Sequence, residues 1–226
     1  MRNSEDIFAQ KGRVGPIVIR AFIQARMSSS RFPGKVLAPF RGKPLIKHVV
    51  ERVNGLLPAS NITVLTSSEE SDDPLETYLE RAGIHVFRGP LVNVFERFRL
   101  CLVEQPCDWI LRISADSPLL SADVLRRVVQ APLESDCDLV TTIFPRTFPR
   151  GNNAELIRSS LLDIAPQELT ADDREHVTPY YYRHSSQYRI CNIVSGSPEL
   201  AESNLAVDTV EDLRRLESLP FQGPTR

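Results

Sequence analysis

The feature that most constrains this sequence is an apolar run that ends abruptly in a basic, hydroxyl-rich loop. The run 17–23 (IVIRAFI) is typical of a strand in a parallel sheet that is covered on both faces. The loop 26–35 (RMSSSRFPGK) then supplies three cations, three serines and a glycine. Because open α/β sheets bind ligands beyond the carboxyl ends of their strands, we predict that this loop binds a polyphosphate through hydroxyls, backbone N–H groups and positive charge.

A solvated basic loop, with serines that cap a helix, is the alternative interpretation of the same residues. The position directly after a buried strand favours phosphate binding, since a motif is supported by its structural context. The loop differs from the P-loop pattern G-x-x-x-x-G-K-[ST], because Gly34 and Lys35 are followed by Val36. Any phosphate site here is therefore of another kind.

Strand and helix patterns alternate along the chain up to residue 143, which predicts a mostly parallel, Rossmann-like α/β sheet with helices on both faces. The expected strands lie at 61–66, 84–87, 108–113 and 138–143, and the expected helices at 45–57, 74–82, 92–104 and 121–130. The later pattern is irregular, and there we expect strands at 154–157, 188–194 and 204–207 and helices at 158–164, 172–182 and 209–216. The cap of the last helix is Asp208 or Thr209.

The chain has 226 residues, which is enough to bury the core of one domain. We expect this domain to span 17–226, and the polar segment 1–16 to be a flexible N-terminal extension. A net charge of −2 argues against a general nucleic-acid-binding surface. No apolar run approaches the ~20 residues that a membrane-spanning helix needs. Four cysteines without a C-x-x-C pair are typical of free thiols, so we expect a cytoplasmic location.

Two aspartates follow short apolar runs and are candidate ligands of Mg²⁺. Asp116 follows the expected strand 108–113, and Asp208 follows the expected strand 204–207. Mg²⁺ binds through one or two carboxylates together with phosphate oxygens, which fits a site beside a triphosphate. Each aspartate has an alternative role, Asp116 in a turn or helix cap and Asp208 as an ordinary N-cap. Their spacing in the sequence leaves open whether they meet.

Six motifs occur in order along the chain: IQARMSSSRFPGKVL, GKPLIKHVVERV, RISADSPLL, PRGNNAEL, REHVTPYYY and LAVDTVEDL. Together they resemble the cytidylyltransferases that make CMP-activated acidic sugars, above all the spore-coat-polysaccharide type. Sialic-acid and 3-deoxy-octulosonate cytidylyltransferases are more distant relatives. The resemblance covers nearly the whole chain after residue 16. It implies a glycosyltransferase-A-like α/β fold, CTP as co-substrate, Mg²⁺ as cofactor and, commonly, a homodimer.

The resemblance also implies roles for individual residues. Catalytic roles fall on Arg26, Lys35 and Asp116. The nucleotide-binding residues would be Ala25, Arg26, Ser29, Arg31, Lys35, Ser67 and Asp116, and the metal ligands Asp116 and Asp208. On the acceptor side or at a dimer contact, the motifs place Arg150, Glu155, Arg174, Glu175 and His176.

Three residues depart from the family pattern: Ser28 replaces a usual Gly, Asn153 a usual acidic residue and Asn204 a usual Arg. They bear on acceptor identity and on catalytic competence, and they leave the loop and both aspartates in place. The predicted function is transfer of CMP from CTP to a sugar or sugar-acid acceptor with release of pyrophosphate, for surface-glycan precursor synthesis. Two alternatives stay open: transfer from an NTP to a sugar phosphate or phosphonate, and a nucleotide-binding protein that has lost catalysis. The sequence does not specify the acceptor.

Overall fold

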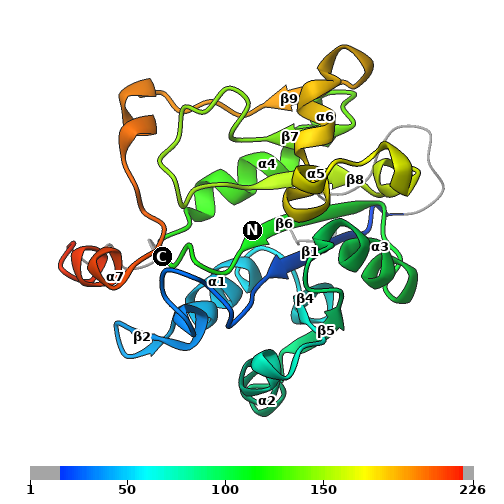
Figure 1. The fold of residues 1–226 in the computed structure, drawn as a ribbon. Helices are drawn as coiled ribbons and strands as arrows, with labels where there is room; N and C mark the ends of the chain where they lie inside the picture. The colour runs from blue at the N-terminus through cyan, green and yellow to red at the C-terminus, as the bar shows by residue number, and fades with distance from the viewer. Residues whose placement is uncertain (1–15, 221–226) are drawn as a thin grey trace.

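The computed structural model describes residues 16–220, and a seven-stranded sheet forms the centre of this part of the chain (Figure 1). The strand order is β5-β4-β1-β6-β8-β7-β9. Strand β8 (Glu155–Arg158) is antiparallel to both of its neighbours, whereas β7 (Leu139–Thr141) and β9 (Ile190–Asn192) pair in parallel. The other four strands run parallel to one another: β1 (Ile19–Gln24), β4 (Ile62–Ser67), β5 (His85–Gly89) and β6 (Trp109–Ser114). The prediction of a mostly parallel α/β sheet is confirmed. The predicted extension 1–16 lies outside the described residues, except for its last residue.

Helices cover both faces of this sheet. One face carries α1 (Leu45–Asn54), α2 (Asp73–Arg81) and α4 (Ala122–Glu134). The other face carries α3 (Val94–Glu104), α5 (Ala171–His176) and α6 (Pro179–Arg183). Because side chains alternate along a strand, neighbouring residues of β1 serve different cores. Ala21 and Ile23 belong to the first core and Phe22 to the second.

A smaller apolar cluster closes the end of the fold near the C-terminus. Helix α7 (Val210–Glu217) packs against the two-stranded hairpin of β2 (Pro39–Phe40) and β3 (Lys43–Pro44) through Leu216 and Phe40. This contact brings the chain's last helix next to the loop that follows β1 (Figure 1). Among residues 16–220, no helix is long and apolar enough to cross a membrane.

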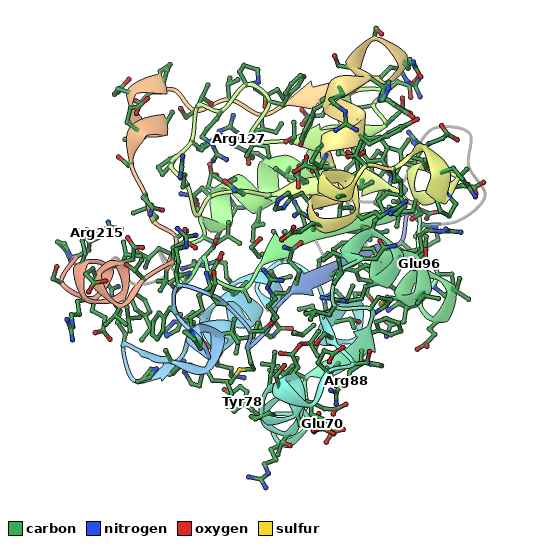
Figure 2. All side chains as sticks on the ribbon, in the orientation of Figure 1. Glu70, Tyr78, Arg88, Glu96, Arg127 and Arg215 are labelled. Atoms are coloured by element: carbon green, nitrogen blue, oxygen red, sulfur yellow. The ribbon has the colours of Figure 1, made fainter. Side chains whose placement is uncertain are left out.

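The opposite end of the sheet is fastened by an ion-pair network in addition to the apolar contacts of Leu75 and Leu79 on α2. Arg88 on β5 reaches Asp73 (2.7 Å) and Glu76 (2.5 Å) of α2, and it also donates to the Glu69 carbonyl (2.7 Å). Figure 2 shows Arg88, Glu70 and Tyr78 gathered around α2. This network holds the carboxyl end of the outermost parallel strand β5 to its helix and to the loop that follows β4.

The carboxyl ends of β1 and β6 lie side by side. In their register Gln24 is opposite Ser114, the last residue of each strand. The pairing continues one step further, because Ala115 N donates to Gln24 O (3.0 Å) and Ala25 N donates to Leu65 O (3.0 Å). The loops that carry the predicted site residues therefore start from fixed, adjacent points.

The expected helix 172–182 is wrong as a single element, because the chain turns sharply between α5 and α6. Val177 has φ 71°, which is rare for a β-branched residue, and Thr178 N donates to His176 O (2.9 Å) across it. Pro179 has no backbone N–H and its ring would clash with the preceding turn, so α5 cannot continue through it. The turn leaves His176 at the end of α5, at the border of the cavities described below.

The expected strand 204–207 is also wrong, since this segment pairs with loops instead of the sheet. Its regular pairing is one isolated bridge between Asn204 and Arg150. Val207 N then donates to Asp116 O (2.8 Å). The neighbouring Gly151 (φ 91°) has no room for a side chain, because a Cβ there would lie 2.5 Å from backbone of the same segment. This close approach places the segment 204–207, and with it the next residue, Asp208, beside the loop that follows β6.

The expected helix 158–164 is a 3-10 helix, Ser159–Leu162, instead of an α-helix. Its first N–H is used by the sheet, because Ser159 N donates to Asp108 O (2.9 Å) at the start of β6. The segment therefore extends the antiparallel pairing of β8 before it coils.

Candidate active site

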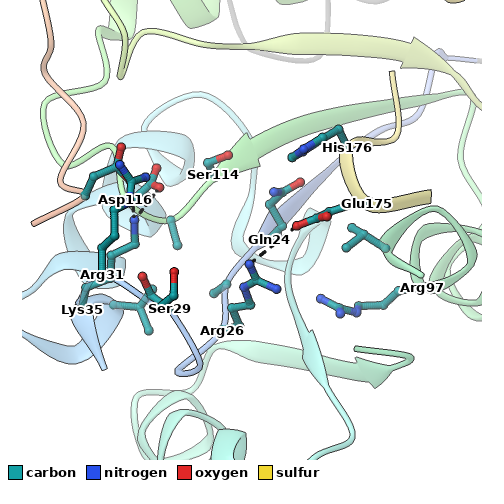
Figure 3. A pocket seen from close by; sticks show the side chains of 16 residues that line it. Gln24, Arg26, Ser29, Arg31, Lys35, Arg97, Ser114, Asp116, Glu175 and His176 are labelled. Atoms are coloured by element: carbon teal, nitrogen blue, oxygen red, sulfur yellow. Dashed lines mark hydrogen bonds and ion pairs between the residues drawn. The ribbon is translucent and has the colours of Figure 1, made fainter. Parts of the chain in front are cut away.

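A cavity of about 310 Å³ opens at the carboxyl edge of the sheet, between the loops that follow β1 and β6 (Figure 3). The chain contributes to it from five segments that are far apart in sequence: 24–36, 94–97, 114–116, 175–176 and Asp208. Nine residues predicted to act in binding or catalysis line this cavity: Ala25, Arg26, Ser29, Arg31, Lys35, Asp116, Glu175, His176 and Asp208. We call it the nucleotide cavity, for the ligand that these residues were predicted to bind.

Lys35 joins the two aspartates whose meeting the sequence left open. Its ammonium nitrogen Nζ donates to Asp116 Oδ2 (2.9 Å), Asp208 Oδ1 (3.1 Å) and the Val207 carbonyl (2.8 Å). Arg31 Nη2 also lies 3.0 Å from Asp208 Oδ1. The two carboxylates therefore form an acidic pair that is balanced by cations of the predicted phosphate loop.

Local sequence explains how Lys35 reaches this position. Gly34 adopts the left-handed conformation (φ 73°), which suits a residue without Cβ, and its N–H donates to Met27 O (2.8 Å). This bond closes the loop, and a 3-10 helix, Lys35–Leu37, starts directly after it. Lys35 is 8% exposed, so the turn places a nearly buried cation under the mouth of the cavity.

Asp208 is available for this contact because another residue caps the last helix. The Thr209 side chain accepts from Asp212 N, and the Asp212 side chain accepts from Thr209 N in return. Of the two predicted caps of α7, Thr209 is therefore the one that the structure uses. The Asp208 carboxylate points to Lys35 and Arg31 instead.

The acidic pair fits a magnesium ion shared with phosphates. No cluster of three or more His, Cys, Asp or Glu side chains that could hold a metal is present among the residues that the structure describes. Asp116 and Asp208 converge on one cation, and Mg²⁺ commonly takes one or two carboxylates and completes its shell with water and phosphate oxygens. The donor set thus suits a metal that arrives with a nucleotide, rather than a closed protein cage.

A buried aspartate that sequence reasoning missed anchors the start of the loop. Asp72 accepts from Met27 N (2.7 Å), Thr66 Oγ1 (2.8 Å), and both the N–H (2.9 Å) and the hydroxyl of Ser67. Burial alone would raise the pKa of Asp72, but the hydrogen bonds from Ser67, Met27 and Thr66 outweigh it and lower that pKa. Ser67, predicted to bind nucleotide, is fully buried and lies behind the loop as a partner of Asp72. A polar run such as 67–73 gave no signal that one of its acids is internal.

Arg97 is a second cavity residue that sequence reasoning missed. It lies on α3, is 2% exposed and lines the cavity near Arg26 (Figure 3). Burial lowers the pKa of Arg97 to about 10. Arg26 itself faces Glu175 at 3.8 Å, which ties the phosphate loop to α5. An arginine within a helical pattern is normally expected at a solvent-exposed position, so the burial of Arg97 was not predictable from the sequence.

A second cavity, of about 360 Å³, adjoins the first and shares Gln24, Ser114 and His176 with it. Its floor is Glu155, which is 1% exposed and accepts from Arg112 Nη1 and from the Tyr182 hydroxyl. Burial and the nearby Glu155 raise the pKa of Tyr182. We call this space the acceptor cavity, because it contains Glu155 and borders His176, both predicted on the acceptor side.

The structure leaves two predicted acceptor residues outside both cavities. Arg150 is exposed, and Arg174 is half-buried and donates to the Pro166 carbonyl (2.9 Å). Asn153, the residue in place of a usual acid, lines the acceptor cavity and accepts from Arg146 Nη1 (2.6 Å). Of the other two departures, Ser28 is exposed, and Asn204 accepts from Ala206 N (2.9 Å).

A parallel sheet whose carboxyl edge combines a basic serine loop with an acidic pair is typical of proteins that bind nucleotides together with a divalent metal. Residues 20–220 match the family model of cytidylyltransferases. The chain is 31% identical over 204 residues to the spore coat polysaccharide biosynthesis protein SpsF of Bacillus subtilis, which covers 87% of this chain and 84% of that protein. It is 28% identical to the 3-deoxy-manno-octulosonate cytidylyltransferase of Cytophaga hutchinsonii, with 89% and 86% covered.

A solved structure of a cytidylyltransferase from Leptospira borgpetersenii superposes with a TM-score of 0.82 at 28% identity, and covers 89% of this chain and 85% of that one. The chain belongs to the cytidylyltransferase family. The resemblance seen in the motifs, the α/β fold and the enzyme class predicted from them are confirmed.

Proposed function

We propose that this enzyme transfers CMP from CTP to a sugar-acid acceptor, with release of pyrophosphate, and so prepares a precursor of a surface polysaccharide in the cytoplasm. The observation that carries the proposal is the convergence of Lys35, Asp116 and Asp208 at one end of the nucleotide cavity. The names of the relatives support the product class, since one is a spore coat polysaccharide biosynthesis protein and another acts on 3-deoxy-manno-octulosonate.

In this reaction an acceptor oxygen attacks the α-phosphorus of CTP. A new P–O bond forms, the bond from the α-phosphorus to the oxygen bridging to the β-phosphate breaks, and pyrophosphate leaves with that electron pair. The acceptor hydroxyl loses its proton to solvent. Two anionic reactants must approach each other, so the enzyme contributes mainly neutralising charge and orientation.

The side chains of the nucleotide cavity suit this task. Arg31 and Lys35 place positive charge where the triphosphate would lie, and the Ser29 hydroxyl can donate to a phosphate oxygen. Asp116 and Asp208 would hold Mg²⁺, which when bound supplies further positive charge to the phosphate oxygens. The acceptor would bind in the acceptor cavity and reach the α-phosphate across the boundary between the two cavities, where Gln24, Ser114 and His176 lie.

Pyrophosphate release from CTP and Mg²⁺ in the presence of a panel of sugar acids tests the proposal. We expect turnover with at least one sugar acid, and loss of it in Asp116→Asn and Lys35→Ala. Lys43→Ala is the matched control, because Lys43 is exposed and pairs with Glu51 outside both cavities. Full turnover in either cavity variant would refute the assignment. Turnover only with a sugar phosphate or phosphonate would replace the acceptor class, and CTP binding without turnover would indicate lost catalysis.

The homodimer is part of the same proposal and rests on the family resemblance. Light scattering of the purified enzyme should give twice the mass of the chain. A monomer at all concentrations would overturn it without affecting the assignment of the two cavities.

A further inference from the structure

Arg97 is a buried cation with an unused donor that faces the nucleotide cavity. Its Nε and Nη2 atoms both donate to the Pro90 carbonyl (3.0 and 2.6 Å), and Nη2 also donates to the Leu91 carbonyl (3.0 Å). Among residues 16–220, no acceptor is hydrogen-bonded to Nη1 and no carboxylate pairs with the guanidinium. Nη1 therefore carries two N–H bonds that a ligand in the cavity can accept.

Burying a charged side chain without an ion-pair partner costs free energy, and we therefore look for a function of the Arg97 guanidinium that offsets this cost. Tethering the segment 90–91 uses only Nε and Nη2 and does not explain why Nη1 is left at a cavity wall. Although burial lowers the pKa of Arg97, a value of about 10 keeps the side chain charged at neutral pH. The group is therefore a permanent donor inside the protein.

The surroundings hold this donor in place before any ligand binds. Gly89, the last residue of β5, makes room for the side chain, because a Cβ there would lie 2.8 Å from Arg97 Cγ. The next two carbonyls then fix the guanidinium from one side. The result is a rigid fork anchored at its inner edge and open at Nη1, which is the arrangement that recognition by hydrogen bonds requires.

The position within the cavity points to the base rather than to the phosphates. Figure 3 shows Asp116, Arg31 and Lys35 gathered at one end and Arg97 at the other, beyond Arg26. A nucleotide with its triphosphate at the lysine end would place its base near Arg97. The apolar residues Ala25 and Val94 line the same cavity and can pack against a flat ring.

We propose that Arg97 selects cytosine over uracil by donating from Nη1 to the N3 atom of the base. This inference rests on the proposed use of CTP and assigns the residue that enforces it. N3 of cytosine is an acceptor, whereas N3 of uracil carries a hydrogen and would face another donor. Because a guanidinium cannot accept a hydrogen bond, uracil leaves the contact at N3 unsatisfied.

Calorimetric titration of CTP, UTP and 3-deaza-CTP into the enzyme with Mg²⁺ tests this directly. In 3-deaza-CTP a C–H replaces N3, so only that acceptor is lost. We expect the wild-type enzyme to bind CTP at least about tenfold more tightly than either of the other two nucleotides, since hydrogen bonds to charged groups are worth that much or more. In Arg97→Met, CTP should weaken to the level of 3-deaza-CTP, so that the preference disappears.

Arg99→Met is the matched control, because Arg99 lies on the same helix but pairs with Glu96 (3.1 Å) outside the cavity. It should keep the full preference for CTP. A purely structural role of Arg97 would weaken all three nucleotides in parallel and leave their ratios unchanged, and that result would overturn the inference. If Arg97→Met does not fold, the comparison of CTP with 3-deaza-CTP in the wild-type enzyme decides alone, and equal affinities refute the proposed contact. Failure of the wild-type enzyme to bind any CTP would instead remove the proposed function.

Discussion

The two cavities share one wall but differ in how their charges are balanced. In the nucleotide cavity, the acidic pair of Asp116 and Asp208 is held by the nearly buried Lys35 and by Arg31 at the mouth, and an anion that enters can take over these cations. In the acceptor cavity, Glu155 is nearly buried and is already paired with Arg112 and Tyr182. The charged groups of the nucleotide cavity are therefore available to a ligand, whereas the buried carboxylate of the acceptor cavity is already paired within the protein.

This difference separates function from stability. Changes to Asp116, Asp208 or Arg31 at the mouth of the nucleotide cavity should lower activity with little effect on folding, since these side chains are partly exposed. Changes to the buried pair of the acceptor cavity should lower stability first, because breaking such a pair leaves a charge without a partner. The following predictions test that separation.

The largest effect is expected at Asp208. Asp208→Asn keeps the size of the side chain and removes the charge that would help to hold the metal, so pyrophosphate release should fall about 10³-fold, equivalent to roughly 4 kcal/mol. The melting temperature should stay within about 2 °C of the wild type. Glu217→Gln, on the surface of α7, serves as control and should leave turnover unchanged. A large loss of stability in Asp208→Asn would contradict the claim that changes at the nucleotide cavity lower activity without lowering stability.

The next effect is expected at Arg112 and is one of stability. Arg112→Met leaves Glu155 buried without its ion-pair partner, so the free energy of unfolding should fall by about 3 to 5 kcal/mol. Arg112→Met with Glu155→Gln should recover part of this loss, as urea unfolding would show. Lys43→Met breaks the exposed pair with Glu51 and should cost less than about 1 kcal/mol. An equally small cost at Arg112 would mean that the acceptor cavity is not held by this pair.

A smaller loss of stability is expected at Asp72, behind the phosphate loop. Asp72→Asn exchanges one acceptor oxygen for a donor that faces the N–H and hydroxyl groups of residues 66–67, and should cost about 2 kcal/mol. CTP should also bind more weakly, because Met27 N loses part of its anchor. The same change at the exposed neighbour, Asp73→Asn, should cost under about 1 kcal/mol. Unchanged CTP affinity in Asp72→Asn would show that the loop is fixed by other contacts.

The smallest effect is a dependence of stability on pH. Burial opposes ionisation of Asp72, yet its hydrogen bonds lower the pKa of the folded state below the usual carboxyl value near 3.9. The stability that it contributes is therefore present above that usual value and is lost as the pH falls through the folded pKa. Urea unfolding at pH 6, 4 and 3 should show a steeper loss in the wild type than in Asp72→Asn. Parallel losses would assign the acid sensitivity to other groups.

The parts of the fold that the sequence predicted are those with local causes. The run 17–23 predicted β1 within two residues, and the helical spacing at 92–104 predicted α3 within two residues. The errors have two different causes. Pro179 is a local signal that breaks an otherwise continuous helical pattern. The segment 204–207 has the apolar pattern of a strand, but Leu205 N and Val207 N bond to distant loops instead of to the sheet.

The candidate site divides in the same way. Arg26, Arg31 and Lys35 were predictable because they follow one strand in one loop. The contact between Lys35 and Asp208 spans 173 residues, and nothing in the spacing encodes it. Arg97 and Asp72 escaped notice because charged residues are expected in solvent, and only tertiary packing shows that both are internal.

The melting temperature of the enzyme with Mg²⁺ and each of CTP, UTP, ATP and GTP tests the central claim most directly, because it requires no knowledge of the acceptor. At a CTP concentration about 100 times its Kd, binding should stabilise the fold by about 2.7 kcal/mol and raise the melting temperature by roughly 5 to 10 °C. UTP, ATP and GTP at the same concentration should raise it clearly less. No shift with CTP, or equal shifts with all four nucleotides, would contradict the account.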